Sequence, residues 1–194
     1  MELVLEPITH TYTRDGVRVP GISEIIQSAG MVDDKWFTEY SRDRGSMAHL
    51  ACQLHDEDDL DESTLDPVIR PYLEAWKKFR ADTCFNPELI ERKLYHPVYG
   101  YAGTLDRYGL FNDYKSVIEL KSGLISAVTG LQLAAQGMLL EANGYEVQKR
   151  FALQIKKDGA YKLTPYNDAN ARVVFLACVT AHNFKTQNGI IKEA

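Results

Sequence analysis

The chain has 194 residues, of which 45% are apolar and 25% charged, as expected for one soluble globular domain with a core of its own. The net charge of −5 excludes a strongly basic protein that coats DNA through a general electrostatic field. It does not exclude an enzyme whose site is itself acidic, because carboxylates that hold metal ions also lower the net charge.

The first 86 residues are expected to be mainly helical. Asp15-Gly16 predicts the turn of a short strand or hairpin around residues 12–16. A short helix is expected after Pro20-Gly21 and before Gly30, a longer one from about residue 33 to 54, and a third over 65–81. The acidic run 55–62 is interpreted as a solvated loop, because it lacks the spacing and the glycine of a calcium-binding loop.

From residue 87 the pattern changes to strands. Strands are expected at residues 89–95, 98–110, 116–120, 147–155 and 161–163, with a turn at 158–159. Helices are expected over 126–143, before Gly144, and over 168–186. We therefore predict one domain over residues 1–194, with a mainly helical part (1–86) and an α/β core (87–194) whose mixed sheet is flanked by helices.

Two neighbouring segments carry the residues that point to chemistry, namely 103–106 (GTLD) and 117–123 (VIELKSG). Residues two apart in a strand face the same side, so Glu119 and Lys121 should project together. Val117 shares that side, whereas Ile118 and Leu120 face the opposite one. We expect Asp106, at the end of the preceding strand, to lie beside Glu119.

Two adjacent carboxylates repel each other unless a cation lies between them. A divalent ion there would polarise a phosphodiester and acidify a bound water, and Lys121 would position or deprotonate that water. The alternative is a plain surface hairpin, since E-x-K alone is common. Asp106 together with the E-x-K pair, on successive strands, favours the metal centre.

These segments, with 132–136 (QLAAQ), resemble the RecB-like, phage-exonuclease branch of the PD-(D/E)XK nuclease superfamily. The resemblance extends upstream to residues 10–25, to 44–49 (RGSMAH) and to 90–95 (IERKLY). The motifs follow the family's order over roughly residues 10–140. The resemblance implies a restriction-endonuclease-like core and a metal-dependent DNA nuclease.

The resemblance also implies roles for individual residues. The implied metal ligands are His49, Asp106, Glu119 and the backbone carbonyl of Leu120. Lys121 would be the catalytic lysine, Glu91 would support the site, and Gln132 would contact the lysine region or the substrate strand. The implied substrate contacts are Ser23, Gln136, Tyr12 and Arg44.

Several of these roles have a structural alternative. His49 falls opposite the apolar stripe predicted for its helix (Met47, Leu50, Ala51 and Leu54), where a histidine is more often solvated than a ligand, but the family motif favours the ligand. Gln132 and Gln136 share a helix face, which is either exposed or turned to the site, and the family often has Tyr in place of Gln136. Ser23 is an N-cap or a phosphate contact, and Tyr12 stacks on a base or packs in the core.

The leading hypothesis is a phage or prophage-type exonuclease that acts on linear single- or double-stranded DNA with one or two Mg²⁺ or Mn²⁺ ions. A recombination or annealing protein, and further copies of the chain, are expected partners. The alternatives are a non-cleaving DNA- or protein-binding module on the same fold and a structure-specific endonuclease.

The remaining expectations concern cysteines and location. The three cysteines are odd in number and never form a C-x-x-C pair, so we expect reduced thiols and no iron–sulfur cluster. No apolar window is long enough to span a membrane, and the N-terminus lacks the layout of a signal peptide. We therefore expect a protein of the bacterial host cytoplasm without a membrane anchor.

Overall fold

A computed structural model of the chain describes residues 2–6, 9–32 and 38–191. The main sheet has five strands in the order β4-β5-β6-β7-β8. Neighbouring strands are antiparallel, except that β6 and β7 run parallel. These strands are β4 (Asn86–His96), β5 (Tyr101–Phe111), β6 (Tyr114–Lys121), β7 (Lys149–Ile155) and β8 (Tyr161–Pro165). The predicted mixed sheet is confirmed.

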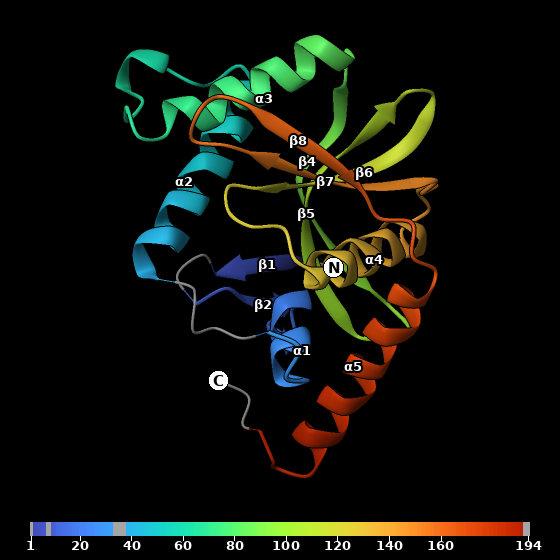
Figure 1. Cartoon of the computed structure of the whole chain (residues 1–194). Coiled ribbons are helices and arrows are strands. Elements are labelled where there is room, and N and C mark those ends of the chain that lie inside the picture. The colour runs from blue at the N-terminus through green and yellow to red at the C-terminus, as the bar shows by residue number, and fades with distance from the viewer. Residues whose placement is uncertain (1, 7–8, 33–37, 192–194) are drawn as a thin grey trace.

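Helices cover both faces of this sheet (Figure 1). They are α1 (Ile22–Ser28), α2 (Glu39–Asp56), α3 (Arg70–Thr83), α4 (Ala127–Ala142) and α5 (Asn170–Gln187), with a 3₁₀ turn, η2 (Glu62–Thr64). Helices α1, α4 and α5 pack on one face around a first apolar core, and α2 and α3 pack on the other around a second. Val117 belongs to the first core, whereas Ile118 and Leu120 belong to the second, so the predicted alternation along β6 is confirmed.

A small antiparallel sheet precedes the helices, with strands β1 (Leu3–Glu6), β2 (Thr11–Arg14) and β3 (Val17–Val19). The predicted turn at Asp15-Gly16 joins β2 to β3, and both residues have positive φ (50° and 80°), as a type I′ hairpin turn requires. Tyr12 and Val19 bury one face of this sheet against Ala102 of β5. The small sheet is thereby attached to the strand that carries Asp106.

Two helix boundaries differ from the prediction. The expected start of α2, near residue 33, lies outside the described residues, and the described helix begins at Glu39, where the Thr38 side chain accepts a hydrogen bond from the Ser41 amide. At its other end α2 continues to Asp56, so the acidic run is only partly a loop. Helix α3 begins at Arg70, five residues later than predicted, with a proline in its first turn.

The buried face of α2 also differs from the predicted stripe. Ala48, Ala51 and Cys52 are the buried residues, whereas Met47 and Leu50 are 46% and 52% exposed. Small side chains let α2 lie close to the sheet, so hydrophobicity alone did not identify its inner face. The shift turns His49 toward the sheet rather than to solvent.

Gly103 allows a close approach between β5 and the helices of the first core. A Cβ atom at this position would lie 2.5 Å from Cδ1 of Ile22 and 3.0 Å from Cδ1 of Leu139. Gly103→Ala is therefore expected to lower the free energy of unfolding by about 1–3 kcal/mol through overpacking. Urea denaturation measures this loss.

Gly123→Ala is the control, because a Cβ there meets no atom within 4 Å and its φ is not in the left-handed region. Equal stability of the two alanine variants would contradict the close approach at Gly103.

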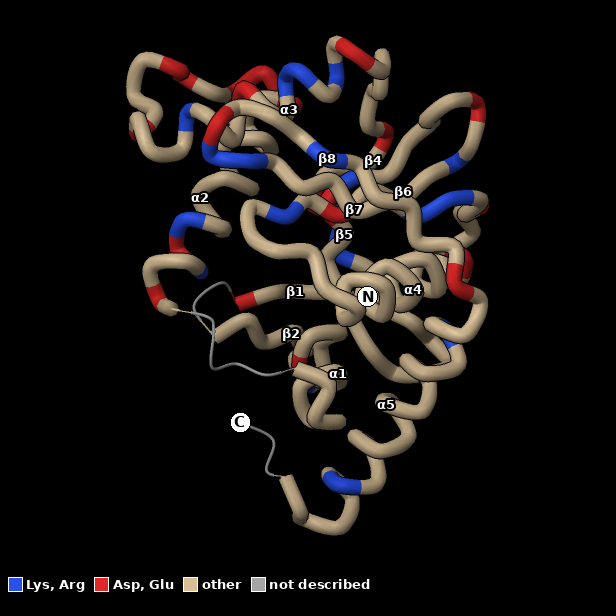
Figure 2. The backbone as a smooth tube through the Cα atoms, viewed as in Figure 1, with Lys and Arg blue, Asp and Glu red and all other residues tan. Residues whose placement is uncertain are grey.

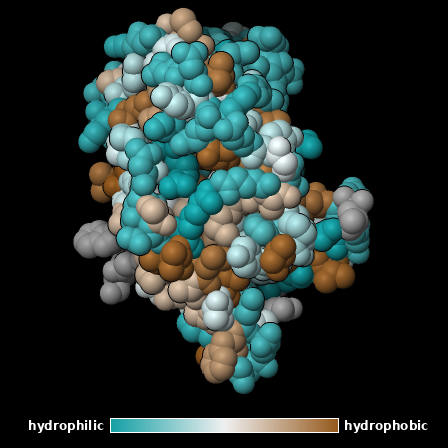
Figure 3. Space-filling view, turned by 90° about the vertical axis from the view of Figure 1, so that its right-hand side faces the viewer, coloured by the Kyte–Doolittle hydropathy of each residue, from teal (hydrophilic) through white to brown (hydrophobic). Residues whose placement is uncertain are grey.

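Charged positions are unevenly distributed. In Figure 2, acidic and basic positions meet at the centre of the molecule, around β5 and β7, whereas α5 is almost free of charge. The side view in Figure 3 shows a mainly hydrophilic upper part and apolar residues scattered over the lower part. None of the helices in the described part of the chain is both long and apolar enough to cross a membrane.

Candidate metal centre

Polar side chains from three strands and two helices meet at the centre of the main sheet. They are His49 on α2, Glu91 on β4, Asp106 on β5, Glu119 and Lys121 on β6, and Gln132 and Gln136 on α4. Asp106 lies in the middle of β5 and not at the end of the strand, where it was expected. The structure thus brings together all seven of these residues, through hydrogen bonds and ion pairs.

The Asp106 side chain forms a hydrogen bond with the backbone of β6. The backbone ladder between β5 and β6 reaches only to Arg107 opposite Ile118. Beyond that point the Leu120 amide donates to Oδ2 of Asp106 at 2.7 Å. The other carboxylate oxygen lies 3.5 Å from Nδ1 of His49. Because β5 and β6 are not paired beyond this point, the Leu120 amide is free to bind the Asp106 carboxylate, and this bond orients the carboxylate toward α2.

Glu91 completes a group of possible metal ligands. It lies between Ile90 and Arg92, which pair in register with β5, and its own φ is 43°, a left-handed value that is rare outside glycine. Its Oε1 lies 3.9 Å from Nδ1 of His49. One ligand atom each of His49, Glu91 and Asp106 lies within 4.8 Å of the others. An imidazole nitrogen and two carboxylates form a donor set that fits a divalent cation.

Glu119 lies beside this group rather than within it. Its Oε1 accepts from Nζ of Lys121 at 2.8 Å, and its Oε2 accepts from Nε2 of Gln136 at 2.6 Å. Lys121 also donates to Oε1 of Gln132 at 2.9 Å. The lysine amino group is therefore held between a carboxylate and an amide, next to the ligand group. The Leu120 carbonyl stays a predicted ligand.

The electrostatics of the group show how strongly the carboxylates interact. Burial and the neighbouring Asp106 raise the pKa of Glu91 to about 7, and the same two causes raise the pKa of Glu119. Burial alone would lower the pKa of His49, but Asp106 outweighs it and raises this pKa to about 9. Burial opposes ionisation of Asp106, yet His49 keeps the pKa of that carboxyl below its usual value. The His49 imidazolium thus partly balances the negative charge of the neighbouring carboxylates.

The candidate metal centre is open to solvent. A cavity of about 320 Å³ is lined by His49 and Glu91 together with Gly45, Ser46, Leu50 and Gln53. A Cβ at Gly45 would lie 3.4 Å from the Ser122 hydroxyl, so the chain after β6 passes close to this turn of α2.

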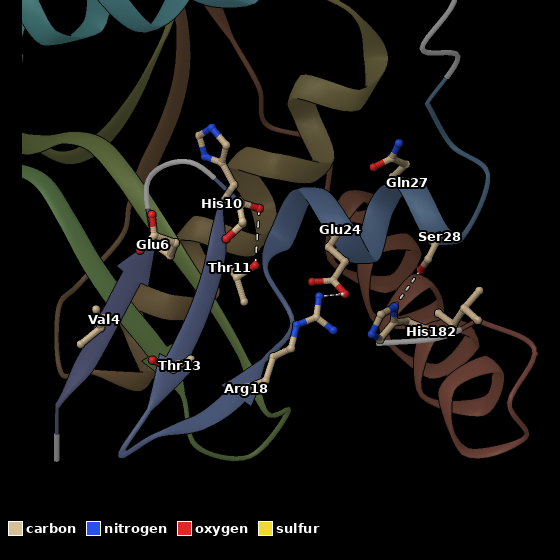
Figure 4. Close-up of a pocket in the computed structure, with 12 residues that line it drawn as sticks. Val4, Glu6, His10, Thr11, Thr13, Arg18, Glu24, Gln27, Ser28 and His182 are labelled. Carbon is tan, nitrogen blue, oxygen red and sulfur yellow. Dashed lines mark hydrogen bonds and ion pairs between the residues drawn. The ribbon is translucent and has the colours of Figure 1, made fainter. Parts of the chain in front are cut away.

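A larger cavity, of about 870 Å³, lies between the small sheet, α1 and the end of α5 (Figure 4). Polar side chains in it bond to each other: Arg18 to Glu24 at 3.0 Å, and Ser28 to His182 at 2.9 Å. None of the residues of the metal centre lines it. Ligand chemistry, rather than cavity size, therefore identifies the candidate site.

Two of the expected substrate contacts are turned inward. Gln136 is 4% exposed and holds Glu119 and the Thr104 carbonyl, so it supports the site instead of presenting an amide to DNA. Tyr12 is 9% exposed, and its hydroxyl shares a hydrogen bond with the Thr104 hydroxyl at 2.8 Å. For Tyr12 the core-packing alternative is correct, because the small sheet folds its ring against β5.

The other two expected contacts lie apart from the ligand group. Ser23 is exposed, but Gly21 is the N-cap of α1, so Ser23 does not cap that helix. The Arg44 guanidinium lies 5.7 Å from the ring centre of Tyr72 and 5.9 Å from that of Tyr40. Their contacts with DNA stay predictions.

A buried ionic network behind the site escaped sequence analysis. Asp56 accepts hydrogen bonds from Trp76, Arg80 and Arg107, and Arg107 also donates to Glu91. The prediction of a solvated loop for residues 55–62 is wrong at Asp56, whose side chain is fully buried. The sequence signal was an arginine directly after Asp106 on a predicted strand, because a cation that the sheet buries needs an acidic partner.

Comparison with known proteins supports the fold. No protein family model and no curated protein matches the chain. A crystal structure from Eubacterium rectale, named "Putative exonuclease", matches with a TM-score of 0.56 and 12% identity, over 87% of this chain and 74% of that one. An alkaline exonuclease from Laribacter hongkongensis matches with a TM-score of 0.44 and 16% identity, over 88% of both chains. At such identities the likeness concerns the fold alone: this chain has a mixed α/β fold shared with the solved Eubacterium protein.

Proposed function

We propose that this protein is a divalent-metal-dependent deoxyribonuclease of the PD-(D/E)XK type, and specifically a phage or prophage-type exonuclease of the RecB-like branch. One observation carries the proposal. His49, Glu91 and Asp106 present ligand atoms within 4.8 Å of one another, beside a lysine held by Glu119 and Gln132. The exonuclease name of the Eubacterium structure with the same fold agrees with it.

A bound divalent ion would polarise the scissile phosphodiester and acidify a water. His49, Glu91 and Asp106 would hold the ion. Glu119 would become a further ligand if it lost its hydrogen bond from Lys121 or from Gln136. The imidazole favours Mn²⁺ over Mg²⁺, because hard Mg²⁺ prefers oxygen ligands.

Lys121 is suited to act on the attacking water and on the developing negative charge. Its side chain is 24% exposed, so it is accessible to solvent. Burial opposes the charge on its amino group, but Glu119 outweighs this and keeps the pKa of Lys121 above its usual value. The amine is therefore a cation that orients a water and stabilises an oxyanion, and Gln132 fixes its direction.

Cleavage of linear DNA should depend entirely on the metal. End-labelled single- and double-stranded DNA is expected to be degraded with Mn²⁺ or Mg²⁺ and to stay intact with a chelator, because the water lacks an activating ion. Gel analysis of the products measures this.

A circular duplex of the same sequence separates the alternatives. An exonuclease leaves it intact, whereas a structure-specific or site-specific endonuclease opens it. Binding of DNA without cleavage, under every metal condition, would instead support the non-cleaving module and end the nuclease proposal.

A further inference from the structure

Arg107 lies fully buried between the metal centre and the helices α2 and α3. Its Nε donates to Oδ2 of Asp56 at 2.7 Å. Its Nη1 donates to Oε1 of Glu91 at 3.0 Å and to the Asp106 carbonyl at 2.7 Å. A cation removed from water needs such partners. The guanidinium thus connects an acid on α2 with a member of the ligand group.

Asp56 holds Arg107 from behind. Its other oxygen, Oδ1, accepts from Nε1 of Trp76 at 2.8 Å and from Nη1 of Arg80 at 2.7 Å. The Trp76 ring also lies against the guanidinium, with 5.3 Å between the ring centre and Cζ of Arg107. With three donors on one fully buried carboxylate, neither Asp56 nor Arg107 has room to change its orientation.

Glu91 is the residue in the ligand group that most needs support. Its backbone has a left-handed φ of 43°, although the residues on either side pair normally with β5. A non-glycine residue stays in this region only where its surroundings hold it there. The bond from Arg107 to its carboxylate, at 3.0 Å, is shorter than its 3.9 Å approach to His49.

We propose that Arg107 is a positioning residue for the metal centre: anchored by Asp56, it clamps the Glu91 carboxylate at the place where it faces His49 and Asp106. Arg107 is fully buried, so it acts through Glu91 and not as a ligand. This inference rests on the metal centre proposed above. The planar fork of an arginine spans two carboxylates at once, whereas a lysine offers a point charge.

The test is a calorimetric titration of the full chain with Mn²⁺, which needs no catalysis. Arg107→Lys keeps the charge and loses the bridge, so its affinity for Mn²⁺ is expected to fall about 10–100-fold, as for other residues that orient a metal ligand. Arg18→Lys is the matched control, because Arg18 pairs with Glu24 at 3.0 Å in the other cavity, which no residue of the proposed metal centre lines. It should bind Mn²⁺ like the wild type. In a Glu91→Ala background, Arg107→Lys should cause no further loss.

Circular dichroism checks that each variant is folded. If Arg107→Lys does not fold, Asp56→Asn replaces it. This change weakens the anchor of Arg107 without altering the Arg107 or Glu91 side chain itself, and a loss of affinity for Mn²⁺ is again expected. Two results overturn the positioning role but leave the metal centre standing. One is wild-type affinity for Mn²⁺ in the folded variant, and the other is an equal loss of affinity when Arg107→Lys is added to Glu91→Ala. A wild-type protein that binds no Mn²⁺ overturns the metal centre itself, and this inference with it.

Discussion

Substitution of Lys121 by methionine is expected to lower the rate of metal-dependent DNA cleavage by about 10²–10⁴-fold, the range for a group that acts directly on a proton or a developing charge. Methionine retains the apolar stem but cannot donate to Glu119 or Gln132. Single-turnover cleavage of end-labelled DNA under saturating Mn²⁺ measures the effect on the chemical step.

Lys115→Met provides the matched control on the same strand. Lys115 lies at the other end of β6 and bonds Glu88 on the surface, so its replacement should leave cleavage unchanged. Mn²⁺ affinity should survive in Lys121→Met, because the lysine is not a ligand. Cleavage by Lys121→Met at the wild-type rate would remove Lys121 from the reaction.

Removal of the Asp56 carboxylate is expected to give the largest loss of stability. Asp56→Ala should lower the free energy of unfolding by about 3–5 kcal/mol, because it leaves buried charges without their partner. The fully buried Arg107 would lose the acceptor of its Nε, and the Trp76 indole N–H would lose its acceptor as well. Equilibrium denaturation in urea, followed by circular dichroism, measures the change.

An exposed ion pair serves for comparison. Glu88 pairs with Lys115 between two exposed side chains, and Glu88→Ala should change stability little because solvent already screens that pair. Similar losses for Asp56→Ala and Glu88→Ala would show that the buried network contributes no more than a surface contact.

The elements that could be predicted are those whose signal is local. The Asp15-Gly16 turn follows from the positive φ that glycine tolerates, and the alternation of β6 follows from the two-residue period of a strand. Asp106, Glu119 and Lys121 were recognised because they lie close together in the sequence and in a known motif order. Strand pairing then places them side by side.

The elements that could not be predicted depend on contacts between distant segments. The inner face of α2 consists of Ala48, Ala51 and Cys52, and its choice depends on how closely α2 meets α3 and β4. Asp56 appears in an acidic run, and only the fold brings Arg107 to it from 51 residues away. Gln136 was assigned to DNA because nothing local shows that Glu119 takes its amide.

The left-handed backbone at Glu91 also bears on how this protein would respond to directed evolution. Glycine or asparagine adopts that conformation with less strain, so a library selected for thermal resistance alone should accumulate such replacements at position 91. Each of them would discard a carboxylate that faces His49. Under the proposed function, the chain keeps a strained backbone at this position for the sake of the carboxylate, which trades stability for activity at a single residue.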